Sequence, residues 1–342
     1  MTVQLKRLCK EVDMQRDKKI QLLRIMAMFM IVACHLVQEY NSDTIAMTAQ
    51  FFNVGVYVFF LISGFLYGGK EIGGFLKWFI KRMTKLLIPV YIFLIFVFAM
   101  NYLILGSFSI EKIFVYLFNL QGVFGTVLGA SHLWFLTTIM FCYGLIPLFS
   151  VIRKWKSNLR SGLFLLAILM MALIISFTYK YAGQQLFYIL TFALGYLFGP
   201  KLKKIPANWA MLLCTIGLMF IIRLVARKFV DGTILYDVIV SSITHIVISV
   251  SLFVAIFKIN LKTKEKTLNR LDSMSYYIYI VHYIFMVGPL RLMGATDNSV
   301  VNTALTIIAS YVAAEILKVL TTGVYKLVGI EKKKHNMELV GK

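Results

Sequence analysis

The residues with the clearest chemical potential lie in the first apolar segment of the chain: Arg24, His35 and Glu39. Arg24 and His35 are eleven residues apart, which on a helix turning about 100° per residue brings both to one face, roughly 16 Å apart along the axis. Glu39, four residues beyond His35, falls on the same stripe. Ionisable groups are costly inside an apolar helix, so a cation, an imidazole and a carboxylate on one face indicate a functional site. Taken singly, each residue also has a structural explanation. Arg24 could anchor the helix end by extending its charged group to the membrane surface, and His35 could be an interior histidine whose hydrogen bonds are made within the protein.

A basic group follows the second apolar segment and consists of Lys81, Arg82 and Lys85. At helical i, i+1 and i+4 spacing, these side chains could hold phosphates by charge-assisted hydrogen bonds. The simpler alternative is the ordinary positive charge of a cytoplasmic loop.

Two further motifs contain small or aromatic residues. Ser63-Gly64-Phe65 lies within the second apolar segment, where small residues usually let two helices approach closely. His132 and Trp134 open the fourth apolar segment at the predicted outer surface. There Trp is common as an interfacial anchor, but Trp and His also stack on and hydrogen-bond sugars.

The elements that position these residues are predicted to be transmembrane helices. Of the 342 residues 60% are hydrophobic and only 15% charged, whereas soluble domains have about 45–50% apolar and about 25% charged residues. The net charge of +21 is gathered in short clusters between apolar runs, which is typical of membrane loops and excludes a nucleic-acid-binding surface.

The apolar runs predict an all-α polytopic membrane protein with about ten spans, since each crossing needs about 20 mostly apolar residues. The spans are expected near 22–38, 51–69, 86–105, 132–152, 161–179, 186–200, 207–225, 234–257, 275–293 and 300–322. Of the 36 Lys and Arg residues, 29 fall on one side of this arrangement, which predicts that both termini are cytoplasmic. The expected organisation is an N-terminal arm 1–19, one ten-helix membrane domain 20–328 and a basic tail 329–342.

The chain resembles the acyltransferase family 3 of bacterial integral-membrane proteins, in the form of a stand-alone membrane domain. The resemblance rests on motifs in a fixed order. They are Leu23-Arg24 with His35, Gly55-Val56 to Ser63-Gly64-Phe65, Lys81-Arg82 with Lys85 and Pro89, His132-Leu133-Trp134-Phe135-Leu136, and Ser275-Tyr276 with Tyr279 and His282. Members often carry Arg where this chain has Lys85, which keeps the charge but loses the bidentate fork.

The resemblance implies transfer of an acyl group, most commonly acetyl, from cytoplasmic acyl-coenzyme A to a hydroxyl of a surface polysaccharide or lipid-linked glycan. Arg24, Ser63, Lys81, Arg82 and Lys85 would bind acyl-CoA. His35 would be the catalytic base, oriented by Glu39, and His132 and Trp134 would contact the acceptor. No metal, permanently bound cofactor or nucleic acid is expected, and the location implied is the bacterial plasma membrane.

Two other classes of protein also fit a polytopic chain with interior charges. A glycan transporter or flippase is the main alternative, although such proteins often show internal repeats and none is evident here. The other is a membrane scaffold whose polar residues only join helices. A new ester would distinguish the enzyme, because a transporter moves an unchanged molecule and a scaffold does neither.

Overall fold

The computed structural model describes residues 18–40, 42, 45, 48–107, 109–261 and 265–329. In this part of the chain every regular element is a helix and none is a strand, which confirms the all-α fold class. Except for Lys18 and Lys19, the predicted arm 1–19 lies outside the described residues, as does the tail 329–342 apart from Gly329.

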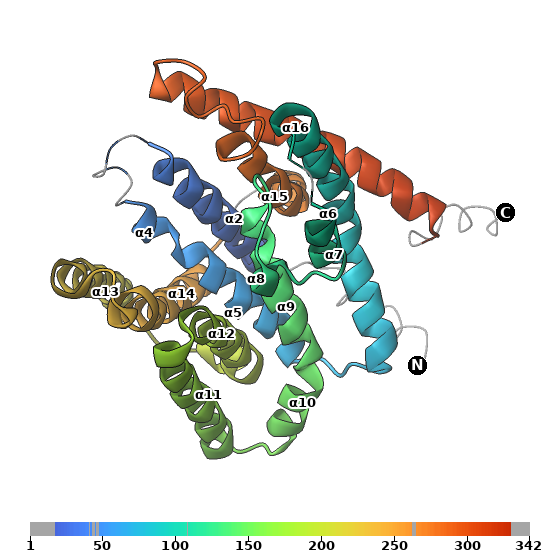
Figure 1. The fold of residues 1–342 in the computed structure, drawn as a ribbon. Coiled ribbons are helices and arrows are strands. Elements are labelled where there is room, and N and C mark those ends of the chain that lie inside the picture. The colour runs from blue at the N-terminus through green and yellow to red at the C-terminus, as the bar shows by residue number, and fades with distance from the viewer. Residues whose placement is uncertain are drawn as a thin grey trace. The chain divides into compact units, whose positions relative to one another are not determined.

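The helices, which are labelled in Figure 1, are divided into two compact units by their contacts. The first comprises Met1–Phe75 and Phe135–Ser275, and the second Leu76–Trp134 and Tyr276–Lys342. The first unit contains α2 (Lys18–Gln38), α4 (Ala49–Phe52), α5 (Val54–Gly68), α10 (Ile146–Lys154), α11 (Asn158–Thr178), α12 (Lys180–Leu202), α13 (Trp209–Val230), the π-helical turn η2 (Leu235–Val240) and α14 (Ser241–Lys258). The second contains α6 (Phe75–Leu105), α7 (Ile110–Leu117), α8 (Gln121–Phe124), the 3-10 turn η1 (Ser131–Leu133) and α16 (Ser299–Leu327). Two more helices, α9 (Trp134–Gly144) and α15 (Glu265–Met286), contribute to both units, and α6 does so through its first residue alone.

The number of helices able to span a membrane can be compared with the ten predicted. Among the described residues seven helices are long and apolar enough, or eight if the bent pair α9 and α10 forms one span. These coincide with eight of the predicted spans. The remaining two fall in α12 and α15, which are helical as expected but carry more polar side chains. The exact number of crossings and the side of the termini stay predictions.

The first unit is built around α5 and α12, which lie side by side (Figure 1). Each helix brings two glycines four residues apart to the contact, Gly64 and Gly68 on α5 and Gly195 and Gly199 on α12. A Cβ added at Gly64 would meet the carbonyl oxygen of Phe192, which is backbone and cannot swing away. Small residues at this spacing let membrane helices approach closely, so Gly64 serves helix packing.

We expect Gly64→Ala to destabilise the protein by about 1–3 kcal/mol or more, because the added methyl group would force α5 away from α12. Gly217→Ala is the matched control. Gly217 also lies inside a helix, α13, but nothing lies within 4 Å of a Cβ built there. Thermal unfolding of both purified variants in detergent is the measurement. Equal midpoints for the two variants would contradict the close contact.

In the second unit, Pro89 interrupts the hydrogen bonding of α6. Proline has no N–H, so the carbonyl of Lys85, four residues earlier, loses its helical donor. The Tyr325 hydroxyl of α16 donates to that carbonyl instead, at 2.8 Å. The Tyr276 hydroxyl of α15 donates to the next carbonyl, that of Leu86, also at 2.8 Å. Two tyrosines therefore join α6 to α15 and α16 close to the proline, one of them at the carbonyl that the proline leaves without a donor.

The segment between α6 and α9 is held by buried polar groups. The Tyr116 hydroxyl donates to the carbonyl of Ala130 and accepts from the N–H of Val127, both at 3.1 Å. Tyr116 lies in the short helix α7, and burial raises its pKa to about 12, so the phenol stays neutral. Gln121 Nε2 donates to the carbonyl of Leu133 at 2.8 Å. These bonds fix the turn η1, which carries His132.

Candidate functional site

In the first unit, the polar side chains of α2 lie in two groups, one near the start of the helix and one near its end. Near the start, Arg24 Nη2 lies 2.9 Å from Asp272 Oδ2 of α15. One turn earlier, Gln21 Nε2 donates to Asn269 Oδ1 at 2.7 Å. The Asp272 side chain is 3% exposed and that of Arg24 30%. Arg24 is therefore part of a largely buried ion pair rather than a plain anchor at a helix end.

His35 lies in the last turn of the same helix and is half-buried. Its Nδ1 lies 3.4 Å from Gln38 Oε1, and since a carbonyl oxygen only accepts, Nδ1 carries the proton. Nε2 is then the unprotonated nitrogen of the neutral ring. The helix ends at Gln38, so Glu39 lies in the following turn, where its N–H donates to the carbonyl of Leu36 at 3.2 Å. The predicted stripe thus holds from Arg24 to His35, and Glu39 lies just past the end of the helix.

Ser63 lies in the middle of α5 and is 4% exposed. Its neighbours Leu61 and Ile62 belong to the hydrophobic core of the first unit, and Gly64 lies against α12. The structure therefore places Ser63 among packed helices.

The basic group lies in the second unit, on a helix rather than in a loop. Lys81, Arg82 and Lys85 are in the first three turns of α6, which begins at Phe75. The side chains of Lys81 and Lys85 are exposed and that of Arg82 is half-buried. The predicted helical spacing of the three cations is therefore correct, and the helix gives them a fixed arrangement.

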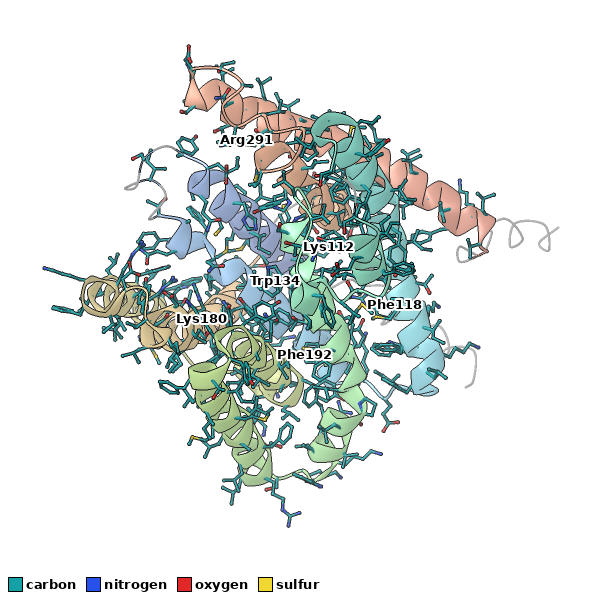
Figure 2. All side chains as sticks on the ribbon, viewed as in Figure 1. Lys112, Phe118, Trp134, Lys180, Phe192 and Arg291 are labelled. Atoms are coloured by element: carbon teal, nitrogen blue, oxygen red, sulfur yellow. The ribbon has the colours of Figure 1, made fainter. Side chains whose placement is uncertain are left out.

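His132 is 4% exposed rather than open to the surface. Its Nε2 donates to the carbonyl of Ile280 at 3.1 Å, and its ring lies 4.8 Å from that of His282, centroid to centroid. The Tyr279 hydroxyl donates to the His132 carbonyl at 2.8 Å. His132 thus belongs to a buried His–Tyr cluster with α15, whereas Trp134, half-buried, opens α9 (Figure 2).

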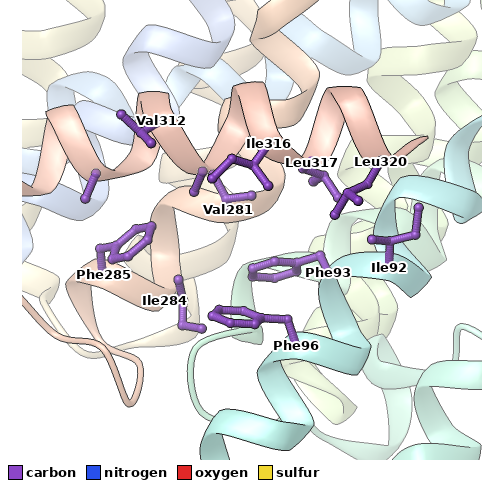
Figure 3. Close-up of a pocket in the computed structure, with 12 residues that line it drawn as sticks. Ile92, Phe93, Phe96, Val281, Ile284, Phe285, Val312, Ile316, Leu317 and Leu320 are labelled. Carbon is purple, nitrogen blue, oxygen red and sulfur yellow. The ribbon is translucent and has the colours of Figure 1, made fainter. Parts of the chain in front are cut away.

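The second unit holds an apolar cavity of about 400 Å³ between α6, α15 and α16 (Figure 3). The side chains that line it include Phe93, Phe96, Ile284, Phe285 and Ile316, and every lining residue is apolar. With no donor, acceptor or charge in its wall, this cavity lacks the groups that orient a sugar hydroxyl or a phosphate.

A polar cavity of about 400 Å³ lies in the first unit at the last turns of α2. Cys34, the residue before His35, and Gln38, its hydrogen-bond partner, both line this cavity. Its other lining residues come from α4, α12, α13, η2 and α14 and include Arg223 and Arg227. In the described part of the chain, no three His, Cys, Asp or Glu side chains are grouped as a metal site requires.

The comparisons with known proteins identify the family. The sequence model of the acyltransferase family 3, an acyltransferase domain, matches residues 17–322, and so covers nearly the whole chain and both units. The chain belongs to this family. It is a multi-pass membrane acyltransferase, because membrane-spanning helices run through the matched region. Neither a curated protein nor a solved structure gave a significant match.

Two residues that contact the candidate residues Arg24 and His35 were missed by sequence reasoning. Asp272 pairs with Arg24 across 248 positions of sequence, and the only local signal was a carboxylate at the edge of an apolar run. Gln38, three residues beyond His35 on the same helix, places its Oε1 3.4 Å from His35 Nδ1. An acceptor at i+3 from an interior histidine was the signal that could have indicated it.

Proposed function

We propose that this acyltransferase moves a short acyl group, acetyl first among them, from cytoplasmic acyl-CoA to a hydroxyl of a cell-surface polysaccharide or lipid-linked glycan. The observation that carries the proposal is α2. One unbroken helix within the family-matched region places an ion-paired cation near one end and a half-buried imidazole near the other. The protein would act in the plasma membrane of a bacterial cell.

The residues proposed to bind acyl-CoA include four cations, Arg24, Lys81, Arg82 and Lys85. Ser63, which is neutral, is proposed to bind acyl-CoA as well. The phosphates and nucleotide of acyl-CoA carry several negative charges, which guanidinium and ammonium groups bind by charge-assisted hydrogen bonds. Asp272 engages Nη2 of Arg24, and a guanidinium has five N–H donors in all. The flexible acyl-pantetheine arm would then extend along α2 toward His35.

His35 is the proposed general base. Its Nε2 would take the proton of the acceptor hydroxyl as that oxygen attacks the thioester carbonyl. The new C–O bond forms as the C–S bond breaks, and the thiolate of coenzyme A leaves and regains the proton from the imidazolium. Gln38 would orient the ring through the Nδ1 proton, and Glu39 would stabilise the imidazolium from the adjoining turn. His132 and Trp134 are the proposed acceptor-side residues of the second unit.

The function is tested in a strain that lacks the gene, complemented with the wild-type chain or with an empty vector. We expect the wild-type chain alone to restore ester groups on the surface polysaccharide, measured by proton NMR, at constant polymer yield. Deletion that abolishes export of the polymer itself would instead point to a transporter. Unchanged ester content after deletion would remove the polysaccharide as the acceptor.

A further inference from the structure

The polar cavity lined by Cys34 and Gln38 of α2 has an uneven distribution of charge. Two of its cations are paired: Lys180 Nζ lies 2.5 Å from Asp237 Oδ2, and Arg227 Nε lies 3.4 Å from Asp231 Oδ2. Arg223, one turn before Arg227 on α13, is paired with no carboxylate among the described residues. The cavity therefore carries one cation whose charge is not balanced there.

Arg223 is also the most deeply buried of the three cations that line the cavity. The residue is 3% exposed, while the Lys180 side chain is 53% exposed and that of Arg227 32%. Its Nη1 donates to the backbone carbonyl of Gln50 at 2.7 Å and to His245 Nε2 at 2.5 Å, and its Nε has no hydrogen-bond partner. A buried guanidinium with only neutral acceptors is costly unless an anion completes it.

The acceptors around Arg223 are themselves held in place. His245 is fully buried, and its ring stacks on Tyr57 with centroids 5.0 Å apart. Because the guanidinium can only donate, Nε2 is the accepting nitrogen, and the protonated Nδ1 lies 3.4 Å from Ser241 Oγ, which can accept from it. Arg223 is therefore fixed by a rigid polar scaffold, as a recognition group must be, and is not a mobile surface cation.

The remaining polar wall suits a sugar. Asn53, Gln50 and Gln38 supply amides, and Tyr236 supplies a hydroxyl. The Tyr236 hydroxyl donates to Gln50 Oε1 at 2.9 Å, and Gln38 Oε1 lies 3.4 Å from His35 Nδ1, so Gln50 and Gln38 would offer a sugar mainly their NH₂ groups. The volume of about 400 Å³ lies within the range of about 300–1,000 Å³ usual for small-molecule sites.

We propose that this cavity binds an anionic sugar of the acceptor glycan and that Arg223 recognises its oxyanion, a uronate carboxylate or a sugar phosphate. The guanidinium would meet the oxyanion by charge-assisted hydrogen bonds. This would hold the sugar beside Cys34 and Gln38, and therefore near the base His35. The inference rests on the proposed function and specifies the class of acceptor.

Binding to the purified protein in detergent tests this without any acyl donor. The probes are D-glucuronate, D-glucose 1-phosphate, D-glucose and acetate at one ionic strength, and the readout is the thermal midpoint over a concentration series. We expect at least one anionic sugar to raise the midpoint at concentrations where glucose and acetate do not. The anionic sugar that raises it at the lower concentration identifies the oxyanion as a carboxylate or a phosphate. Equal shifts of the midpoint with all four probes would overturn the proposal, and so would equal shifts with glucose and the anionic sugars. An acetate shift as large as that of glucuronate would overturn it too.

Arg223→Gln should weaken binding of the anionic sugar by about 10- to 100-fold, the loss expected for one charge-assisted contact. Lys228→Gln is the matched control, because it removes the same charge from the same helix but from an exposed side chain outside the cavity. If Arg223→Gln does not fold, Arg223→Lys, which keeps the charge without the fork, should bind more weakly than wild type. Wild-type affinity in a folded Arg223 variant would overturn the role of Arg223. Ester formation in cells is a separate readout, so this site can fail while the acyltransferase function stands.

Discussion

Replacing His35 by alanine is expected to slow acyl transfer by about 100- to 10,000-fold, the usual contribution of a general base. The loss should appear in the turnover rate and not in acyl-CoA binding, because the proposed donor contacts come from other residues. His35 is half-buried at the end of α2, so its removal should leave the protein folded. The measurement is the initial rate of transfer from labelled acetyl-CoA to isolated polysaccharide, with equal amounts of purified protein.

Three variants separate a base from a positioning residue. His35→Gln keeps a polar side chain but cannot take a proton, so it should be as slow as His35→Ala. Val37→Ala changes a half-buried residue of the same helix that does not line the polar cavity, and it should stay within a few-fold of wild type. Gln38→Leu removes the acceptor for the Nδ1 proton and should lower the rate less than loss of the imidazole itself. A His35→Ala enzyme within ten-fold of wild type would show that His35 is structural.

The helices were predictable because lipid imposes a simple rule, about 20 apolar residues for each crossing. The spans predicted at 161–179 and 207–225 became α11 (Asn158–Thr178) and α13 (Trp209–Val230). Even their starts have a local signal, since Ser157 and Asn208 cap the two helices by accepting from backbone N–H groups. Hydropathy and capping together therefore determine these elements.

Other features depend on contacts that no local pattern contains. The helix expected from residue 86 begins at Phe75, and it continues through Pro89 because Tyr325, distant in sequence, satisfies the carbonyl that the proline leaves open. The single span expected at 132–152 is instead a 3-10 turn and two helices bent by 41°, with Gly144 at the break and Pro147 just after it. Sequence reasoning placed the apolar residues correctly but not the interruptions.

In the candidate site, too, the residues could be identified from the local sequence, whereas their distant partners could not. Arg24 and His35 were identifiable because ionisable groups in an apolar run need an explanation, and their helical spacing followed from local geometry. The partner of Arg24 was not identifiable, since Asp272 lies 248 positions away. For the same reason the buried surroundings of His132 were missed, because they are formed by Ile280 and His282 of α15.

The second large effect is expected from Asp272→Ala, which should lower the free energy of unfolding by about 3 kcal/mol. Removing one partner of a buried ion pair usually costs about 3–5 kcal/mol, because the remaining charge is left buried without compensation. The lower end applies here, since Arg24 keeps 30% of its side chain exposed and can reach some solvent. Thermal or denaturant unfolding in detergent measures the loss. Glu265→Ala is the control, because the Lys18–Glu265 pair is exposed and 3.9 Å long, and exposed pairs contribute about 0–1 kcal/mol.

A double variant separates the structural role of this pair from its proposed role in the reaction. Arg24→Met with Asp272→Leu replaces both charges by apolar side chains, and such replacements often restore stability. We expect this protein to unfold near the wild-type midpoint and yet to require at least ten-fold more acyl-CoA for half-maximal rate, since the phosphates lose a cation. If the double variant is stable and binds acyl-CoA as wild type does, Arg24 only joins α2 to α15. If instead it is as unstable as Asp272→Ala, the cost lies in packing at this contact and not in an unpaired charge.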